Sequence, residues 1–388
     1  MKKILLIDLA IDKLGGAERV INTLANALSA SYHVDVCSVY KYSEKPFYKY
    51  PENVKRRYLI DLSKLPSTKS KSVVSFVFFR SFEKTVEMTF YNKVIKKYCN
   101  TELEKYDVII FGRTMAAVDF LPYMETYKGI VIVRDATHLY DTFKRNQVLM
   151  KKYFPGRVNA FIVSSEESIN AYRDFFQDNT IEILKIYNPL GISPKTANSM
   201  EYKQITGVGR YSKEKGFENL IEAFAIVYSK YPDWNLVLLG AGREYRKYQK
   251  LCKKLGIMQA VTFRKSEDIV EDYCKTGIFV MSSRHEGYAN ALVEALACGV
   301  PSVSFDWYMG VDDIIQDGQT GCIVRLKNRD QYYKAIDDKE NVENLAAKIA
   351  YLIENPEVRK SLSENATGIC NSRDLTKIIS EWTALIEE

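Results

Sequence analysis

Short apolar runs, many of them β-branched, alternate with stretches of helical periodicity along almost the whole chain. They predict strands at residues 4–9, 33–39, 58–60, 106–111, 129–133, 160–163, 181–187, 204–208, 236–239, 261–263, 278–281, 302–305 and 322–324. Helices are predicted at residues 17–28, 72–98, 217–231, 245–255, 342–354 and 375–386, and around Glu294. Because strands that alternate with helices form parallel sheets covered on both faces, the sequence predicts an α/β fold.

The chain is too long for a single core. Its 388 residues exceed the length that one hydrophobic core usually supports, and Asn188-Pro189-Leu190-Gly191 interrupts the alternation near the middle. We therefore predict two domains with a boundary near residue 188.

The cysteines and the apolar runs indicate in which cellular compartment the protein resides. Seven cysteines are scattered without a CxxC pair, which favours a reducing compartment over a disulfide framework or a zinc site. Asp8 interrupts the apolar run that follows the basic N-terminus, so this run is interpreted as a strand and not as a signal peptide. No apolar run approaches the roughly 18 residues that span a bilayer. A cytoplasmic protein is predicted, with any membrane contact peripheral.

Two carboxylates lie near the start of a predicted helix in the stretch RHEGYANALVEALACGVPSVSFD. Asn290 is a candidate N-cap and Gly299 a candidate left-handed C-terminal cap, so Glu286 is expected before the helix and Glu294 about one turn inside it. Unpaired N–H groups at a helix start attract phosphate, which suits a ligand holding both phosphate and sugar. Ordinary capping by acidic residues is the alternative.

Two glycine-containing turns follow predicted strands. Gly15-Gly16 lets backbone N–H groups approach an anion, but it lacks the GxGxxG spacing of a dinucleotide fingerprint. In the corresponding turn of the second half, Arg210 offers bidentate contacts to a diphosphate and Lys215 a point charge. A plain tight turn and a solvated basic turn are the respective alternatives.

These motifs occur in an order and at separations typical of one family. The chain resembles the retaining glycosyltransferases of family four, the "glycosyl transferases group 1", most specifically from residue 205 to 325. The motifs that carry the resemblance are Gly15-Gly16-Ala17-Glu18, Gly209-Arg210 with Lys215-Gly216, Pro232-Asp233-Trp234 leading to Leu239-Gly240-Ala241-Gly242, and Glu286 to Glu294 running into Ala297-Cys298-Gly299-Val300-Pro301.

The resemblance implies a GT-B fold, in which two Rossmann-like domains with parallel sheets face each other across a cleft. Residues 1–188 would form the acceptor-binding domain and residues 189–372 the nucleotide-sugar-binding domain. A helix at residues 373–388 would pack back on the first domain.

The resemblance also implies roles for single residues. Arg210 and Lys215 would stabilise the departing diphosphate, Glu294 would hold the ribose hydroxyls, and Glu286 would contact the donor sugar. Backbone groups would approach the phosphates at Gly15, Gly16, Asn290, Ala291 and Leu292. Family members are thought to use front-face displacement, so that neither carboxylate need be a nucleophile.

The sequence contains no DxD triplet, so no catalytic metal is expected, and no cofactor is implied beyond the donor substrate. Two departures from the family pattern, Gly277 and the run Arg264-Lys265-Ser266, fall where the base should bind. They leave the choice between uridine and guanosine open, with a UDP-sugar preferred on family frequency.

A further catalytic residue is expected in the first domain. The family often places a catalytic or sugar-binding histidine after the strand at 129–133, and His138 follows it in VRDATHLYD. A surface-loop histidine is the alternative, and Asp135 and Arg134 are competitors for the role.

Basic charge concentrates between residues 41 and 105. Fifteen Lys and Arg against seven Asp and Glu give this segment a net charge of +8, against +6 for the whole chain. Within it, the Phe-rich stretch KSVVSFVFFRSF is flanked by basic residues, which predicts peripheral contact of residues 64–97 with an anionic membrane. A core helix with a solvated face is the alternative.

The sequence therefore predicts a metal-independent retaining hexosyltransferase that adds a sugar to a glycan acceptor, with a polyprenyl-diphosphate-linked acceptor at the inner membrane face as one candidate. A transferase acting on a soluble small molecule and a catalytically silent GT-B scaffold are the alternatives. A nucleic-acid binder is disfavoured, because no reading module accompanies the basic charge.

Overall fold

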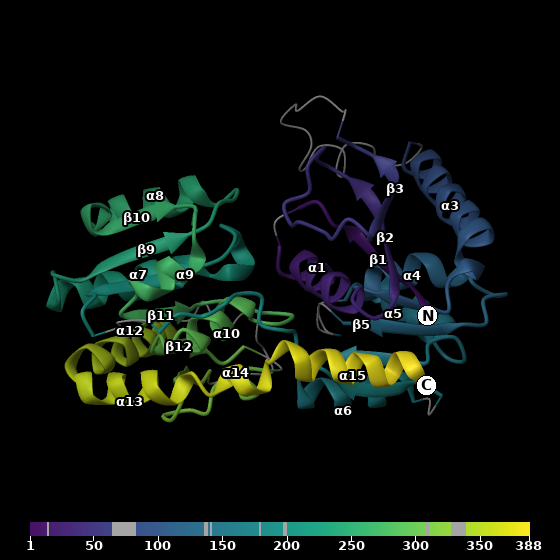
Figure 1. The fold of residues 1–388 in the computed structure, drawn as a ribbon. Helices are drawn as coiled ribbons and strands as arrows, with labels where there is room; N and C mark the ends of the chain where they lie inside the picture. The colour runs from purple at the N-terminus through teal and green to yellow at the C-terminus, as the bar shows by residue number, and fades with distance from the viewer. Residues whose placement is uncertain are drawn as a thin grey trace. The chain divides into compact units, whose positions relative to one another are not determined.

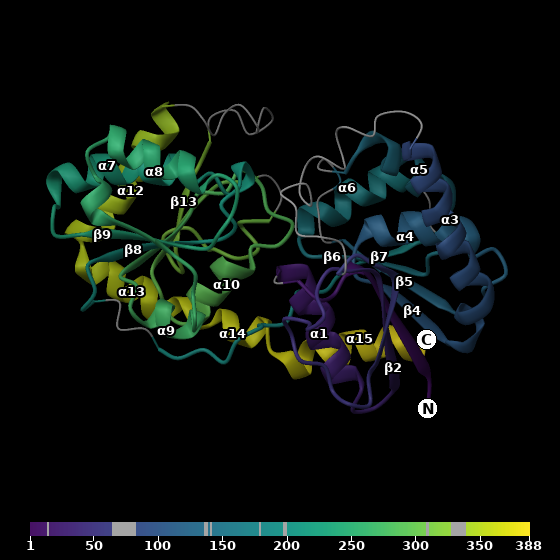
Figure 2. The same cartoon turned by 90° about the horizontal axis from the view of Figure 1, so that it is seen from above.

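The computed structural model describes residues 1–13, 15–63, 83–135, 139, 142–177, 180–196, 200–307, 310–326 and 339–388. The chain divides into two compact units, which are drawn in Figures 1 and 2. The first contains Met1–Ser164, Ser168–Pro189 and Thr376–Glu388. The second contains Ser165–Glu167 and Leu190–Leu375.

The first unit is built on a seven-stranded sheet of order β3-β2-β1-β4-β5-β6-β7, with every pair parallel. Its strands are β1 (Lys3–Ala10), β2 (His33–Lys41), β3 (Lys55–Asp61), β4 (Val108–Phe111), β5 (Ile130–Arg134), β6 (Ala160–Val163) and β7 (Glu182–Lys185). The strand order reverses between β1 and β4. In open parallel sheets, ligands bind outside the carboxyl ends of the strands at such a switch point.

Helices cover both faces of this sheet (Figure 1). They are α1 (Gly16–Leu28), α3 (Glu83–Glu102), α4 (Thr114–Phe120), α5 (Lys144–Tyr153), α6 (Glu166–Phe176) and α15 (Leu375–Glu387). Along β1, Leu5 and Ile7 pack in the core shared with α3 to α6, whereas Ile4 and Leu6 pack in the core shared with α1 and α15. The period-two alternation of β1 therefore supplies apolar side chains to both layers.

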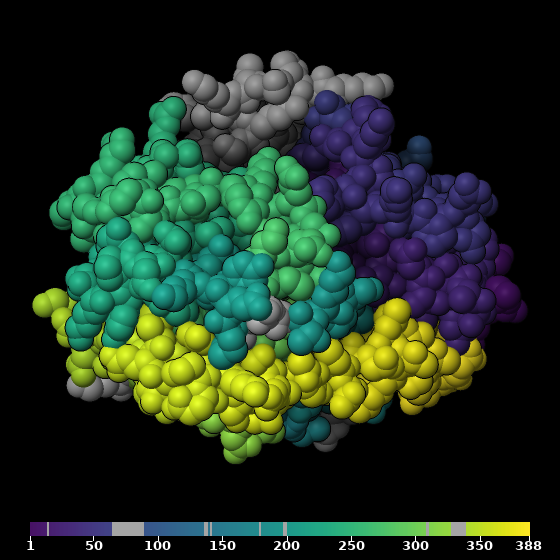
Figure 3. Space-filling view, turned by 60° about the vertical axis from the view of Figure 1, so that its left-hand side comes forward, coloured from purple at the N-terminus to yellow at the C-terminus, as the bar shows by residue number. Residues whose placement is uncertain are grey.

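The C-terminal helix α15 belongs to the first unit, as predicted. Its Trp382 side chain is 2 % exposed and lies in the core with α1. The Tyr32 hydroxyl donates a 2.7 Å hydrogen bond to Glu387, and the Lys2 ammonium lies 3.5 Å from the same carboxylate. In the space-filling view, this yellow helix lies against the purple N-terminal part of the chain (Figure 3).

The second unit has a six-stranded parallel sheet of order β10-β9-β8-β11-β12-β13. Its strands are β8 (Gln204–Val208), β9 (Asn235–Leu239), β10 (Val261–Arg264), β11 (Ile278–Met281), β12 (Ser302–Phe305) and β13 (Cys322–Val324). Its helices are α7 (Phe217–Lys230), α8 (Tyr245–Lys254), α9 (Ile269–Cys274), α10 (Asn290–Ala297), α12 (Lys339–Glu354), α13 (Pro356–Ala366) and α14 (Ile369–Ser372). Here the order reverses between β8 and β11, so both sheets share the doubly wound plan and the predicted fold class is confirmed.

Some bounds differ from the sequence-based prediction, as in β3, β4 and β7. The described part of the helix predicted at 72–98 is α3, which begins at Glu83 and continues to Glu102. Residues 64–82, with most of the predicted membrane-binding stretch, lie outside the described residues. None of the helices in the described parts of the chain combines the length and the apolar character that crossing a membrane requires.

Candidate active site

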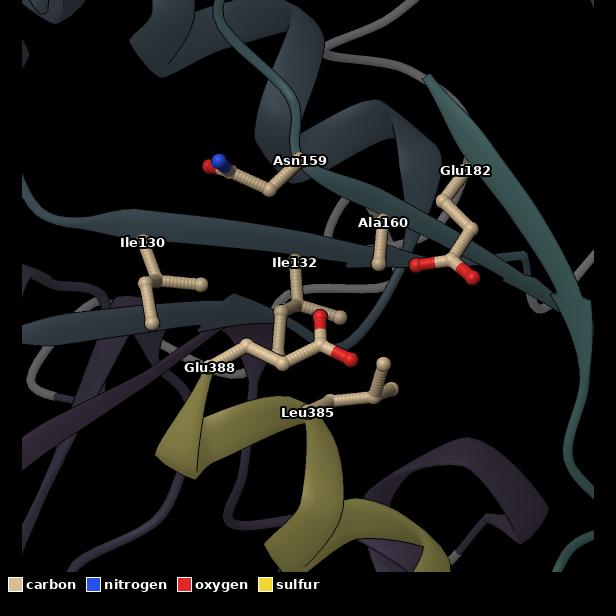
Figure 4. A pocket seen from close by; sticks show the side chains of 7 residues that line it. All are labelled: Ile130, Ile132, Asn159, Ala160, Glu182, Leu385 and Glu388. Atoms are coloured by element: carbon tan, nitrogen blue, oxygen red, sulfur yellow. The ribbon is translucent and has the colours of Figure 1, made fainter. Parts of the chain in front are cut away.

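A pocket in the first unit lies away from the carboxyl ends of the strands. Its volume is about 150 Å³, and it lies at the amino ends of β5, β6 and β7, beside the end of α15 (Figure 4). It is lined by Ile130, Ile132, Asn159, Ala160, Glu182, Leu385 and Glu388. Because parallel sheets bind ligands at the opposite edge, this pocket is not the candidate site.

The candidate site in the second unit lies where β8 and β11, neighbours in the sheet, both end. The turn after β8 carries Lys215, and the loop after β11 carries Glu286. The Lys215 ammonium lies 2.6 and 2.9 Å from the two Glu286 oxygens. Glu286 is only 8 % exposed, and the Ser283 hydroxyl also donates to it. The structure thus brings two of the predicted residues into direct contact, in a largely buried ion pair.

Hydrogen bonds fasten these two loops together. Three successive carbonyl oxygens of the turn, at Lys213, Glu214 and Lys215, accept hydrogen bonds from the loop after β11. The Arg284 guanidinium donates to the Lys213 oxygen, the Arg284 N–H to the Glu214 oxygen at 2.8 Å, and the Ser282 hydroxyl to the Lys215 oxygen at 3.1 Å. The backbone of the turn is therefore held by the loop that carries Glu286.

Glycines permit this close approach. Gly216 has a φ of 57°, and a Cβ there would lie 2.2 Å from the Ser282 oxygen. A Cβ on Gly209 would lie 3.1 to 3.2 Å from three carbons of the Lys215 side chain, which runs across it. Arg210, next in the chain, has an exposed side chain that makes no hydrogen bond or ion pair with another residue that the structure describes. Its guanidinium is accessible to an anionic ligand.

Helix α10 holds the second carboxylate. Glu294 is 4 % exposed, and the buried Tyr273 hydroxyl lies within hydrogen-bonding distance of its Oε2 atom, at 3.2 Å, and of the Ala291 oxygen, at 3.1 Å. Tyr273 lies on α9, and no sequence signal pointed to it. It lies where it can orient the carboxylate that the resemblance assigns to the ribose.

The start of α10 differs from the prediction. Ala289, and not Asn290, occupies the N-cap position, because helical geometry begins at Asn290 itself. The N–H groups of Asn290 and Leu292 already donate to the oxygens of Tyr288 and Ala289, at 2.8 and 2.9 Å. The other end agrees with the prediction, since Gly299 has the left-handed φ of 70° that follows a helix C-terminus.

In the first unit, Gly15 and Gly16 lie at the start of α1, as expected. The Glu18 carboxylate folds back over this turn, so that a Cβ on Gly15 would lie 2.0 Å from its Oε2 atom. Arg113, at the start of α4, donates to Glu18 at 3.0 Å and to the fully buried Asp8 at 3.2 Å. Burial raises the pKa of Asp8, and Arg113 lowers it in part. Charged groups therefore line the switch point of this sheet; Glu18 belongs to a motif noted in the sequence, whereas no sequence pattern pointed to Arg113.

Of the three candidates for a catalytic residue in the first unit, His138 lies outside the described residues. Arg134 is 5 % exposed and donates to the Gly112 oxygen and the Asn188 side chain. Asp135 is 7 % exposed and accepts hydrogen bonds from Thr114 and Tyr172. Both side chains thus take part in buried contacts within the fold.

Comparison with known proteins agrees with this geometry. Residues 192–340 match the family described as glycosyl transferases group 1. An uncharacterized glycosyltransferase of Haemophilus influenzae is 25 % identical over 388 residues and 100 % of both chains. The amylovoran biosynthesis glycosyltransferase AmsD of Erwinia amylovora is 24 % identical over 399 residues and 100 % of both chains.

Solved structures share the fold over the whole chain. Sucrose-phosphate synthase from Thermosynechococcus elongatus superposes with a TM-score of 0.78 at 18 % identity, covering 100 % of this chain and 98 % of the other. Anabaena Alr3699/HepE in complex with UDP gives a TM-score of 0.75 at 17 % identity, with 100 % of both chains covered. The two doubly wound sheets, the ion pair of Lys215 with Glu286 and the matched segment lead to one conclusion: residues 192–340 match the glycosyl transferases group 1 family, and the protein is a glycosyltransferase of GT-B fold.

Proposed function

We propose that this enzyme moves a hexosyl group from a UDP-sugar to a glycan acceptor, with retention at the anomeric carbon and without a catalytic metal, in the synthesis of a surface polysaccharide or oligosaccharide. The contact between Lys215 and Glu286, at the switch point of the second sheet, is the observation that carries the proposal. The similarity to AmsD, a glycosyltransferase of amylovoran biosynthesis, and to HepE, whose structure was solved in complex with UDP, supports the product class and the donor.

In this reaction, an acceptor hydroxyl oxygen bonds to the anomeric carbon while the bond from that carbon to the diphosphate oxygen breaks. In front-face displacement, the hydroxyl proton passes to the departing diphosphate. Charge therefore develops on the leaving group, and fixed cations stabilise it without reorganising. Arg210 and Lys215 are the cations that we assign to this task, with the backbone at Gly15, Gly16, Asn290, Ala291 and Leu292 near the phosphates.

We assign the two carboxylates, Glu294 and Glu286, to the two sugars of the donor. Glu294, oriented by Tyr273, would accept two hydrogen bonds from the ribose diol, and Glu286 would contact the transferred sugar. His138 is our proposed catalytic residue of the first unit. A screen of nucleotide sugars, following release of the nucleotide diphosphate, tests the whole assignment. No release from any donor, with or without glycan acceptors, would favour a silent scaffold.

Glu294→Gln is expected to weaken binding of UDP about tenfold, because an amide replaces the charge-assisted acceptor of the ribose hydroxyls. Calorimetric titration with UDP measures the change. Glu357→Gln, at an exposed position in the first turn of α13, is the matched control and should bind as the wild type does. Unchanged affinity in the Glu294 variant would leave this carboxylate a structural role.

We also propose that the acceptor is lipid-linked and that residues 64–97 hold the enzyme beside it, on the inner face of the cytoplasmic membrane. In the described part of this segment, the side chains of Lys93, Lys96 and Lys97 are exposed along α3, and Phe90 is 59 % exposed. Basic residues near an anionic surface contribute about 1 kcal/mol each. Several of them, with apolar side chains beside them, would suffice for peripheral binding.

Wild-type protein should therefore float with anionic vesicles at low salt and be released as salt rises. A variant with Lys69, Lys71, Arg80 and Lys84 changed to Gln should remain in the soluble fraction. The control removes the same number of charges from the exposed face of α8, by changing Lys247, Lys250, Lys253 and Lys254 to Gln. Wild type that does not float at low salt would favour a soluble acceptor.

A further inference from the structure

We propose that Arg284 is a positioning residue for sugar transfer. It holds the turn that carries Lys215 in place, so that the Lys215 ammonium can contact the leaving diphosphate. The inference rests on the proposed function. It is based on the hydrogen bonds between the turn after β8 and the loop after β11. Arg284 donates to this turn with both its backbone N–H and its side chain.

Arg284 is built into the site and is not a surface cation. Its side chain is 11 % exposed, and its Nη2 atom donates to the Glu218 carboxylate at 3.0 Å while Nη1 donates to the Lys213 oxygen. Glu218 lies in the first turn of α7, the helix that follows the Lys215 turn. One planar group therefore joins the β11 loop, the turn and the helix behind it.

The turn depends on this group because it is a single 3-10 turn, Lys213–Lys215, with few bonds of its own. Within it, the Lys215 N–H donates to the Ser212 oxygen at 3.2 Å and the Gly216 N–H to the Lys213 oxygen at 3.1 Å, and both oxygens also accept hydrogen bonds from side chains outside the turn. The Tyr248 hydroxyl donates to the Ser212 oxygen at 3.0 Å, before the turn, and the loop after β11 supplies donors to the next three. Without the guanidinium, the Lys213 oxygen keeps only the Gly216 N–H and loses its tie to the loop after β11, and the Glu218 carboxylate loses the nearer and more buried of its two cations.

A lysine cannot replace this arginine. The guanidinium is a rigid fork whose separate N–H groups reach two acceptors at once, whereas an ammonium is a point charge on a flexible stem. A shift of about 1 Å in a group that positions the reaction can cost about a hundredfold in rate. The expected defect therefore lies in turnover and in affinity for the diphosphate, since Lys215 contacts that part of the donor.

Arg284→Ala should lower kcat for donor turnover between about tenfold and a hundredfold and weaken UDP binding, and Arg284→Lys should recover only part of this loss. Added guanidinium should restore turnover to the Ala variant more than methylammonium does, because only guanidinium reproduces the fork. Lys247→Gln is the matched control. Lys247 also lies 3.6 Å from Glu218 but does not reach the turn, so this variant should keep wild-type kcat.

These measurements distinguish a positioning role of Arg284 from a purely structural role and from failure of the proposed function. A thermal midpoint that falls in Arg284→Lys while its kcat stays at the wild-type value would show a purely structural role and overturn the proposal. Rescue of the Ala variant by methylammonium as good as that by guanidinium would also overturn it. A wild type that releases no nucleotide diphosphate from any donor would instead contradict the proposed function, whereas UDP affinity would still report on Arg284.

Discussion

Replacing Lys215 or Arg210 by Ala is expected to lower turnover of the donor by about a hundredfold or more, the usual cost of removing one group that stabilises developing charge. Loss of the Lys215 ammonium removes a fixed cation from the turn after β8. Loss of Arg210 removes an exposed guanidinium that makes no hydrogen bond to another described residue and is available to the ligand. Initial rates of UDP release at saturating donor measure both effects.

Lys213→Ala is the control for this pair. It removes a lysine of the same turn whose side chain is exposed and whose backbone contact to Arg284 survives the change. Its turnover should match that of the wild type. If the Lys215 and Arg210 variants also retained near wild-type rates, the leaving group would have to be stabilised by other residues.

Glu286→Gln is expected to separate binding from transfer. The Glu286 carboxylate lies 2.6 Å from the Lys215 ammonium, so a diphosphate that binds Lys215 as proposed would compete with this carboxylate for it. The neutral amide removes that competitor, and UDP should bind more tightly. Transfer should fall by about a hundredfold, since the amide no longer offers the sugar a charged acceptor.

Calorimetry with UDP and single-turnover transfer rates test the two halves of this result. Glu271→Gln is the control, because Glu271 is paired with Lys195 at the same 2.6 Å but with side chains that are 46 % and 64 % exposed. Exposed pairs contribute little, so this variant should change neither quantity. Weaker UDP binding in Glu286→Gln would mean that the carboxylate supports Lys215 and does not compete for it.

Local patterns were sufficient to predict most of the framework. β6, β8, β11, β12 and β13 begin and end at the predicted residues, because buried parallel strands are compact apolar runs with clear borders. Helices with weak patterns were missed. In α5, for example, Met150 is the buried residue of a polar segment, and α4 and α9 are only seven and six residues long.

The residues of the candidate site also fall into two groups, those that the sequence predicted and those that only the structure revealed. Lys215, Glu286 and Glu294 belong to short motifs that follow strands, so the sequence predicted them. Tyr273 and Arg284 have ordinary local contexts. Their importance comes from partners such as Glu294 and Lys213, which are 21 and 71 positions away in the chain. Only the fold makes such pairs, and no local pattern marks them.

The membership of α15 in the first unit has a consequence for synthesis on the ribosome. The core beside α1 contains Ile378, Trp382, Leu385 and Ile386, yet these residues emerge after the whole second unit has been made. The nascent first unit must therefore wait with an uncovered apolar face on its sheet while the second unit, whose residues are complete by Leu375, can already close its own core. Synthesis from the N-terminus thus favours completion of the second unit before the first. The uncovered face of the first unit is where a chaperone would be needed.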